Sequence, residues 1–119
     1  MNNLSIVVLL LIIALIVHLA EEIKAGFRYR FPLGEMPKPV FIGINVVLYT
    51  FCFTTLALAV LESRLAVPFA WAIAVAMLLN GAGHIGAMSV GKKYFPGGIS
   101  AFPLTAVSMY LVIYLAIDT

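Results

Sequence analysis

The side chains best suited to chemistry are His18, Glu21 and Glu22, which close an otherwise uncharged apolar stretch that begins at Leu4. Imidazole and carboxylate groups can bind a metal ion, carry protons or serve as acid and base in hydrolysis. An ionised side chain at the centre of a membrane helix costs about 2.5–3.5 kcal/mol, and less toward the helix ends. We therefore expect these three groups, called the HxxEE cluster below, to have a partner.

The spacing of the HxxEE cluster puts its members on one face of a helix. His18 and Glu22 are four residues apart and Glu21 is three residues from His18, so together they cover an arc of about 100°. An alternative is that this is an interfacial helix end, where the hydrated glutamates pair with Lys24 or Arg28. Whether polar residues of the other helices lie at the same membrane depth as the HxxEE cluster decides between these two interpretations.

Polar residues of the later apolar stretches lie at a matching depth. At a rise of about 1.5 Å per residue, Asn80 and His84 lie about 18–26 Å along the third stretch, and the HxxEE cluster lies about 21–27 Å along the first. Asn45, Ser100 and Thr105 occupy the same layer in the second and fourth stretches. Taken singly, Asn45 and Asn80 are better explained by hydrogen bonds between helices, His84 by a satisfied polar contact, and Thr105 by a bond to a carbonyl of its own helix. Their common depth favours one joint site.

Two histidines and two glutamates from two helices form a plausible ligand set for a divalent metal ion, either Zn or Fe/Mn. Two carboxylates also neutralise one such ion, which removes most of the cost of holding them in the bilayer. One glutamate could be a ligand while the other acts as a general base toward a metal-bound water. We thus predict metal ligands His18, Glu21, Glu22 and His84, catalytic residues Glu21 and Glu22, and supporting or substrate-binding residues Asn45, Asn80 and Thr105.

The composition indicates which elements hold these residues. The chain has 119 residues, of which 64% are hydrophobic and only 10% charged, and its mean hydropathy is +1.14. A soluble domain needs a more polar surface than this. We predict an all-α polytopic membrane protein, a four-transmembrane-helix bundle forming a single membrane domain over 1–119, with helices at about 4–23, 40–61, 67–90 and 99–117.

The basic residues predict the orientation of this bundle in a cell membrane. Six of the seven lie in the two loops at one end, and one lies in the loop at the other end. The positive-inside rule then places both termini outside and the loops 24–39 and 91–98 in the cytoplasm. The six are Lys24, Arg28, Arg30, Lys38, Lys92 and Lys93, and the seventh is Arg64.

Three classes of function fit such a site. The first is a metal-dependent enzyme, hydrolase-like, that acts on a lipid or a membrane-embedded peptide. The second is a small homo-oligomeric transporter or binding protein for protons, metal ions or cationic solutes. The third is an accessory membrane subunit without enzymatic activity. The chain has no phosphate loop, no dinucleotide motif and no nucleophilic Ser/His/Asp set, and its formal net charge of +2 does not indicate nucleic acid.

The order of three motifs resembles that of the HXXEE-domain family of small bacterial integral membrane proteins. The motifs are the HxxEE cluster in the first helix, Asn80-x-x-x-His84 in a later one, and Pro96-Gly97 after it. The likeness covers most of the chain. It implies a membrane fold and a site at His18, Glu21, Glu22, Asn80 and His84, without naming a reaction.

Overall fold

The computed structural model describes residues 1–31 and 34–118. Over these residues the chain forms four α-helices and one short 3-10 helix. Each α-helix is long and apolar enough to cross a membrane, so the predicted four-helix membrane protein is confirmed. The elements are α1 (Asn3–Ala25), η1 (Phe27–Tyr29), α2 (Lys38–Val60), α3 (Ala66–Gly91) and α4 (Gly98–Asp118).

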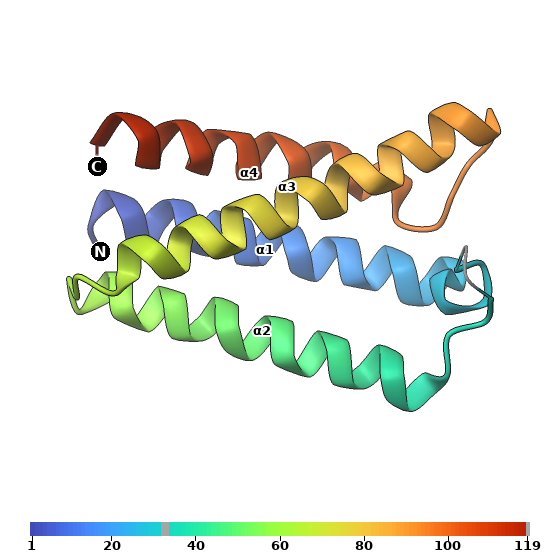
Figure 1. Ribbon diagram of the computed structural model, residues 1–119, viewed down its shortest axis with the longest axis horizontal. Coiled ribbons are helices and arrows are strands. Elements are labelled where there is room, and N and C mark those ends of the chain that lie inside the picture. Colours follow the sequence, from blue (N-terminus) through green and yellow to red (C-terminus); the bar gives the residue numbers. More distant parts are fainter. Residues whose placement is uncertain (32–33, 119) are drawn as a thin grey trace.

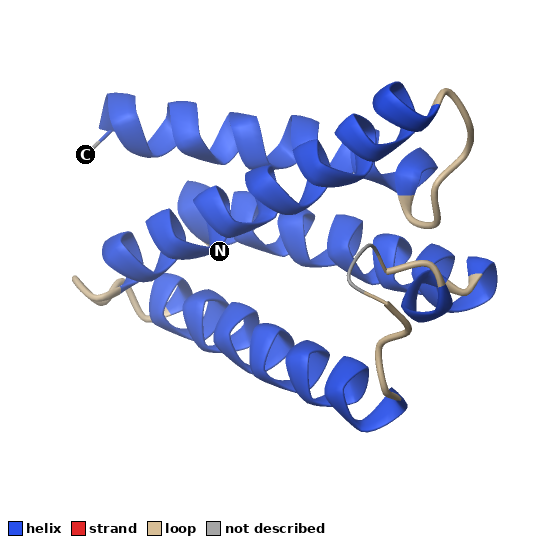
Figure 2. Ribbon diagram, turned by 45° about the vertical axis from the view of Figure 1, so that its right-hand side comes forward, coloured by secondary structure: helices blue, strands red, loops and turns tan. Residues whose placement is uncertain are grey.

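The four helices run alternately up and down, with both termini at one end of the bundle (Figure 1). Each helix packs against the next in the chain, and α4 packs back against α1, so the helices form a closed ring. The α1–α2 and α3–α4 loops lie together at the end opposite the termini (Figure 2). Because His18 and His84 stand near the C-terminal ends of α1 and α3, the ring brings them to this same end.

Local signals set both ends of α1. The side chain of Asn2 accepts a hydrogen bond from the Ser5 backbone N–H at 2.8 Å, which caps the N-terminus. Gly26 ends the helix in the left-handed region, with φ +74°, and its N–H bonds back to the carbonyls of Glu22 and Ile23. This turn folds η1 back across the end of the bundle, where Phe27 reaches the candidate site.

The contact between α3 and α4 depends on a glycine. A Cβ atom added to Gly81 would collide with the Thr105 hydroxyl and lie 3.2 Å from the Ala101 carbonyl oxygen. The absence of a side chain at Gly81 therefore lets the two backbones approach closely.

The second helix, α2, is the least buried of the four: 11% of its most apolar stretch is buried, against 33–44% in the other three.

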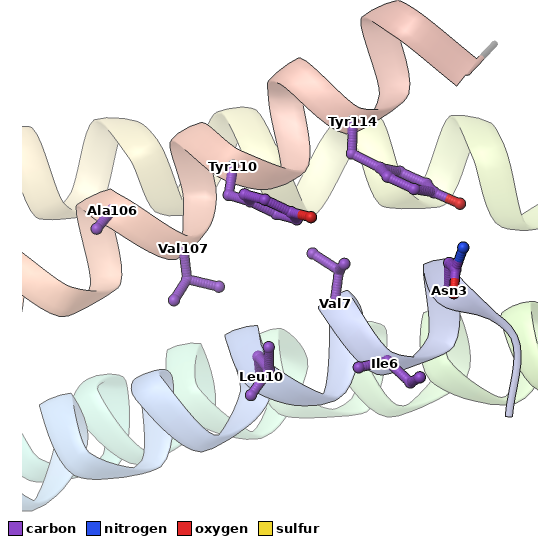
Figure 3. A pocket seen from close by; sticks show the side chains of 8 residues that line it. All are labelled: Asn3, Ile6, Val7, Leu10, Ala106, Val107, Tyr110 and Tyr114. Atoms are coloured by element: carbon purple, nitrogen blue, oxygen red, sulfur yellow. The ribbon is translucent and has the colours of Figure 1, made fainter.

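A hollow of about 530 Å³ lies between α1 and α4, nearer the end that carries the termini (Figure 3). Val7 and Leu10 of α1 face Val107, Tyr110 and Tyr114 of α4 across it. None of the residues predicted for the site lines this hollow, so the candidate chemistry lies elsewhere.

Candidate metal centre

Three side chains from α1 and α3 converge near the loop end of the bundle. The Glu22 carboxylate oxygen Oε2 lies 3.6 Å from His18 Nε2 and 3.3 Å from His84 Nε2. All three side chains are buried: His18 is fully enclosed, and Glu22 and His84 are 8% and 6% exposed. The imidazole rings meet edge to face with centroids 4.5 Å apart. We call these residues the His-Glu-His cluster.

The hydrogen bonds of Ser100 fix the proton on His18. The Ser100 hydroxyl has one proton, and its shortest bond donates that proton to the Glu21 carboxylate at 2.5 Å. The contact of 2.9 Å between Ser100 Oγ and His18 Nδ1 must then be donated by the imidazole. A neutral His18 therefore carries its proton on Nδ1, and its Nε2 offers a lone pair to the cluster.

The same logic applies to His84. Its Nδ1 lies 2.8 Å from the carbonyl oxygen of Pro96, which can only accept a hydrogen bond. The neutral His84 ring is thus also protonated on Nδ1, leaving a lone pair on Nε2. An imidazole held by its Nδ1–H in this way presents Nε2 as a metal ligand in a fixed orientation.

When both imidazole rings are neutral, the cluster consequently gathers lone pairs from three residues. His18 Nε2 is buried and makes no hydrogen bond of normal geometry with any described residue, although the Asn80 side chain lies close to the ring. One ligand atom from each of the three residues lies within 4.8 Å of the others, so the group could hold a metal ion. Bonds of about 2.0–2.2 Å in a tetrahedral site place neighbouring ligand atoms about 3.3–3.6 Å apart. The two measured separations fall in this range.

Glu21, which the sequence analysis groups with the ligands, lies in a different position. Its carboxylate accepts four hydrogen bonds at the start of α4, from the Ile99 and Ser100 backbone N–H groups and from the Tyr94 and Ser100 hydroxyls. Partial burial and this carboxylate raise the pKa of Tyr94, which keeps its hydroxyl protonated as a donor. Glu21 thus lies behind His18 and connects to it through Ser100.

The two sides of the cluster are closed by residues of the loops. A Cβ atom at Gly97 would lie 2.6 Å from His84 Cε1 and 2.9 Å from His18 Cε1, so only glycine fits against both rings. Phe27 of η1 covers His84 from another direction, with ring centroids 5.2 Å apart, and also packs on Phe95. Both histidines are thereby held by the α1–α2 and α3–α4 loops.

The cluster borders a cavity of about 220 Å³. Glu22 and His84 line it, together with the amide side chains of Asn45 and Asn80. The Asn45 amide donates to the Phe41 carbonyl at 2.9 Å, which fixes its orientation on α2. The cavity leaves room for a water molecule or a substrate group beside the two ligands.

Thr105, the last residue of the predicted set, lies away from the cluster. Its hydroxyl oxygen packs against Gly81 and is buried without a hydrogen-bond partner among the described residues.

Three residues that contact the site were not assigned a role from the sequence. Ser100 is predicted at the right depth but without a role, and Tyr94 and Phe27 are not among the predicted site residues. The position of Ser100 just after Pro-Gly-Gly, at the start of a helix, was the available signal.

We predict that Ser100→Ala weakens metal binding by about 10–100-fold, the usual effect of removing a hydrogen bond that orients a ligand. The variant takes away the acceptor of the His18 Nδ1–H and one donor to Glu21. Titration with Zn²⁺ against a competing chelator measures the change. Ser89→Ala is the matched control, because Ser89 is exposed and bonds only to the Ile85 carbonyl. Equal affinity in both variants would contradict the role of Ser100.

The fold and the cluster define a class: a multi-pass four-helix protein with a buried His-Glu-His group that could hold a metal ion. The chain belongs to the HXXEE family, described as proteins of unknown function with an HXXEE motif, whose model matches residues 9–113. The predicted family membership is thus confirmed. Comparisons with curated proteins and with solved structures found no significant match.

Proposed function

We propose that this protein is a metal-dependent membrane enzyme in which His18, Glu22 and His84 hold a divalent metal ion. The observation that carries the proposal is the meeting of two Nε2 atoms, which carry lone pairs in the neutral rings, and one carboxylate oxygen in a buried space. A cation satisfies all three lone pairs at once. The Glu21 carboxylate, linked through Ser100 to His18, supplies the second negative charge that neutralises the ion.

The proposed reaction is hydrolysis. Two histidines and one glutamate with a water in the fourth position form the ligand set of several zinc hydrolases. A divalent ion held by His18, Glu22 and His84 would lower the pKa of a bound water and so supply a nucleophile for a substrate carbonyl; the water proton would go to the leaving group as the ester or amide bond breaks. The amide groups of Asn45 and Asn80 line the same cavity and can bind the carbonyl oxygen. A substrate reaches this cavity from within the membrane.

We further propose that the site faces the cytoplasmic leaflet, with both chain termini outside. The loop end of the bundle carries both the cluster and six of the seven basic residues, while the loop at the other end carries only Arg64. The positive-inside rule assigns the more basic end to the cytoplasm. Cysteine labelling of Lys93→Cys from the outside of intact cells would contradict this orientation.

Metal analysis of purified protein tests the proposal. We expect about one Zn, Fe or Mn ion per wild-type chain after purification without chelator, and background levels in His84→Ala. A three-ligand site that loses one ligand, and with it the anchor on the Pro96 carbonyl, cannot hold the ion tightly. Elemental mass spectrometry measures the ratio of metal to protein.

Asn80→Ala is a useful control, because Asn80 lines the cavity without belonging to the His-Glu-His cluster. This variant is expected to retain the ion and to lose hydrolytic activity. If the wild-type protein stays metal-free after incubation with each of the three metals, the metal proposal fails and the cluster binds a proton instead.

A further inference from the structure

An apolar groove of about 550 Å³ lies between α3 and α2, which is the least buried of the four helices. It is lined by backbone and apolar side chains, from Gly43 to Phe51 on α2 and from Ala72 to Ala76 on α3. At 1.5 Å per residue this section of α2 is about 12 Å long. Since the groove lies on helices that can cross a membrane, the molecules that reach it first are lipids.

The groove borders the cavity beside the His-Glu-His cluster. Ile44 and Leu48 line both the groove and the cavity of about 220 Å³ beside the His-Glu-His cluster. The polar groups are confined to the cavity end, where Glu22 and His84 lie. A molecule lying along both spaces must therefore be apolar over most of its length and polar at one end.

A third space continues from the cavity toward the loops. It has a volume of about 200 Å³ and contains the basic residues Arg28 and Lys38. Glu22, Phe27 and Phe41 line both this space and the cavity. Lys38 makes no ion pair with any described residue, whereas Arg28 lies 3.4 Å from the exposed Glu35 carboxylate. This end of the path favours an anionic group.

We propose that the ligand of this site is an anionic phospholipid. One acyl chain lies in the groove between α2 and α3, the ester carbonyl enters the cavity at Glu22 and His84, and the phosphate lies beside Arg28 and Lys38. The order of the three spaces, apolar, then polar with a candidate metal ion, then basic, matches the order of groups along such a lipid. The inference rests on the proposed function, because it places the ester where the metal-bound water would attack.

Hydrolysis at that position is an acyl-ester cleavage. The oxygen of a water molecule would add to the ester carbonyl carbon, the bond from that carbon to the glycerol oxygen would break, and the glycerol oxygen would take one proton of the water. The products are a fatty acid and a lysophospholipid. Water is the only co-reactant, and no electron transfer is involved.

Native mass spectrometry of the purified protein in detergent tests the binding. The probes are phosphatidylglycerol and phosphatidylcholine with identical acyl chains. We expect one tightly bound phosphatidylglycerol per chain and an affinity for phosphatidylcholine that is at least about fivefold lower. One basic side chain near the headgroup contributes a difference of about this size. Equal binding of the two lipids would overturn the assignment of the basic space.

A variant in the groove tests the acyl-chain position. Gly43 lines the groove and a Cβ atom there meets nothing within 4 Å, so we expect the side chain of Gly43→Leu to occupy the groove without a clash at its Cβ. We expect phosphatidylglycerol to bind at least about tenfold more weakly, because the leucine displaces two or more methylene groups. Gly86→Leu is the control: Gly86 is equally open but lies on α3 outside the groove. Equal loss in both variants would overturn the proposal.

A charge variant and a competition experiment complete the test. Lys38→Gln should lower the preference for phosphatidylglycerol about fivefold, and Lys24→Gln, which lies outside the basic space, should not. If glycerol phosphate competes as well as the whole lipid, the groove is not used and the proposal fails. A dimer that dissociates in Gly43→Leu would show instead that a second copy of the chain covers the groove.

Metal content, measured on the same samples, separates this inference from the proposed function. Gly43→Leu leaves the His-Glu-His cluster untouched and is expected to keep its metal ion. If the wild-type protein retains its metal ion but does not bind the lipid, the lipid inference alone is overturned. Absent metal in the wild type overturns the proposed function.

Discussion

In Glu22→Gln, bound metal is expected to be lost while the metal-free protein becomes more stable. The carboxylate is the only negative ligand of the His-Glu-His cluster, and removing one partner of a buried charge pair costs about 3–5 kcal/mol, a hundredfold or more in affinity. In the metal-free state, however, a glutamine amide can donate protons to His18 Nε2 and His84 Nε2. Each hydrogen bond gained is worth about 0.5–1.5 kcal/mol.

Thermal unfolding with and without Zn²⁺ measures both halves of this prediction. A ligand that binds only the folded state raises the unfolding temperature, so wild-type protein should shift with Zn²⁺ and Glu22→Gln should not. Without metal, the variant should unfold at the higher temperature. A Zn²⁺ shift of wild-type size in the variant would show that Glu22 is not a ligand.

Glu21→Gln is the matched comparison and is expected to behave in the opposite way. Its carboxylate accepts four hydrogen bonds. In glutamine an NH₂ group replaces one of the two oxygens, and this group cannot accept the hydrogen bonds that the oxygen accepted. This variant should be less stable than wild type without metal, because it leaves donors at the start of α4 unpaired. It should still bind Zn²⁺, with lower affinity, since the His-Glu-His cluster is intact.

Gly97→Ala is expected to damage both the fold and the metal site. The residue has φ +91°, a conformation that strains an alanine, and the added Cβ would lie 2.6–2.9 Å from atoms of both imidazole rings. The backbone strain costs about 1–2 kcal/mol and the overpacking about 1–3 kcal/mol. Either the loop shifts or the rings turn, and both changes move the Nε2 atoms away from Glu22.

A fall of about 2–5 kcal/mol in the free energy of unfolding, with at least tenfold weaker Zn²⁺ binding, is therefore the expected outcome. Gly86→Ala provides the control, because its Cβ meets nothing within 4 Å and alanine favours a helix over glycine by about 1 kcal/mol. If Gly97→Ala were as stable as wild type and bound Zn²⁺ equally well, Gly97 would not be holding the rings.

Much of the architecture could be predicted because membrane helices follow simple rules. Uninterrupted apolar stretches define α1 to α4, and their order predicts antiparallel neighbours. The rise per residue then predicts that His18, Glu22 and His84 share one depth. Helical spacing alone, however, cannot say that α1 and α3 stand close enough for their side chains to meet, because they are not neighbours in the ring.

The different surroundings of Glu21 and Glu22 could not be read from the sequence. Adjacent residues on a helix point about 100° apart, so one can face α3 and the other α4. Which glutamate faces which helix depends on the rotation of α1 and on where α4 begins. The structure places the start of α4 beside Glu21, where Ile99 and Ser100 present backbone N–H groups.

The roles of Phe27 and Pro96 were hidden for another reason. Phe27 lies after the helix-ending Gly26, and only the left-handed turn at that glycine brings its ring over His84. Pro96 acts through its carbonyl oxygen, a group that every residue has, so no residue type could signal it. Loop geometry decides both contacts, and helical periodicity does not describe it.

The hydrogen bonds from Glu21 of α1 to the first turn of α4 bear on how the protein is made. The ribosome delivers α1 before α4, so a nascent chain that stops short of residue 98 has an acidic side chain in α1 that lacks three of its four hydrogen bonds, those from Ile99 and Ser100. Such a chain exposes a recognisable defect to membrane proteases. The packing of α4 against α1 would then complete the hydrogen bonds of Glu21 and the support of His18 in a single step.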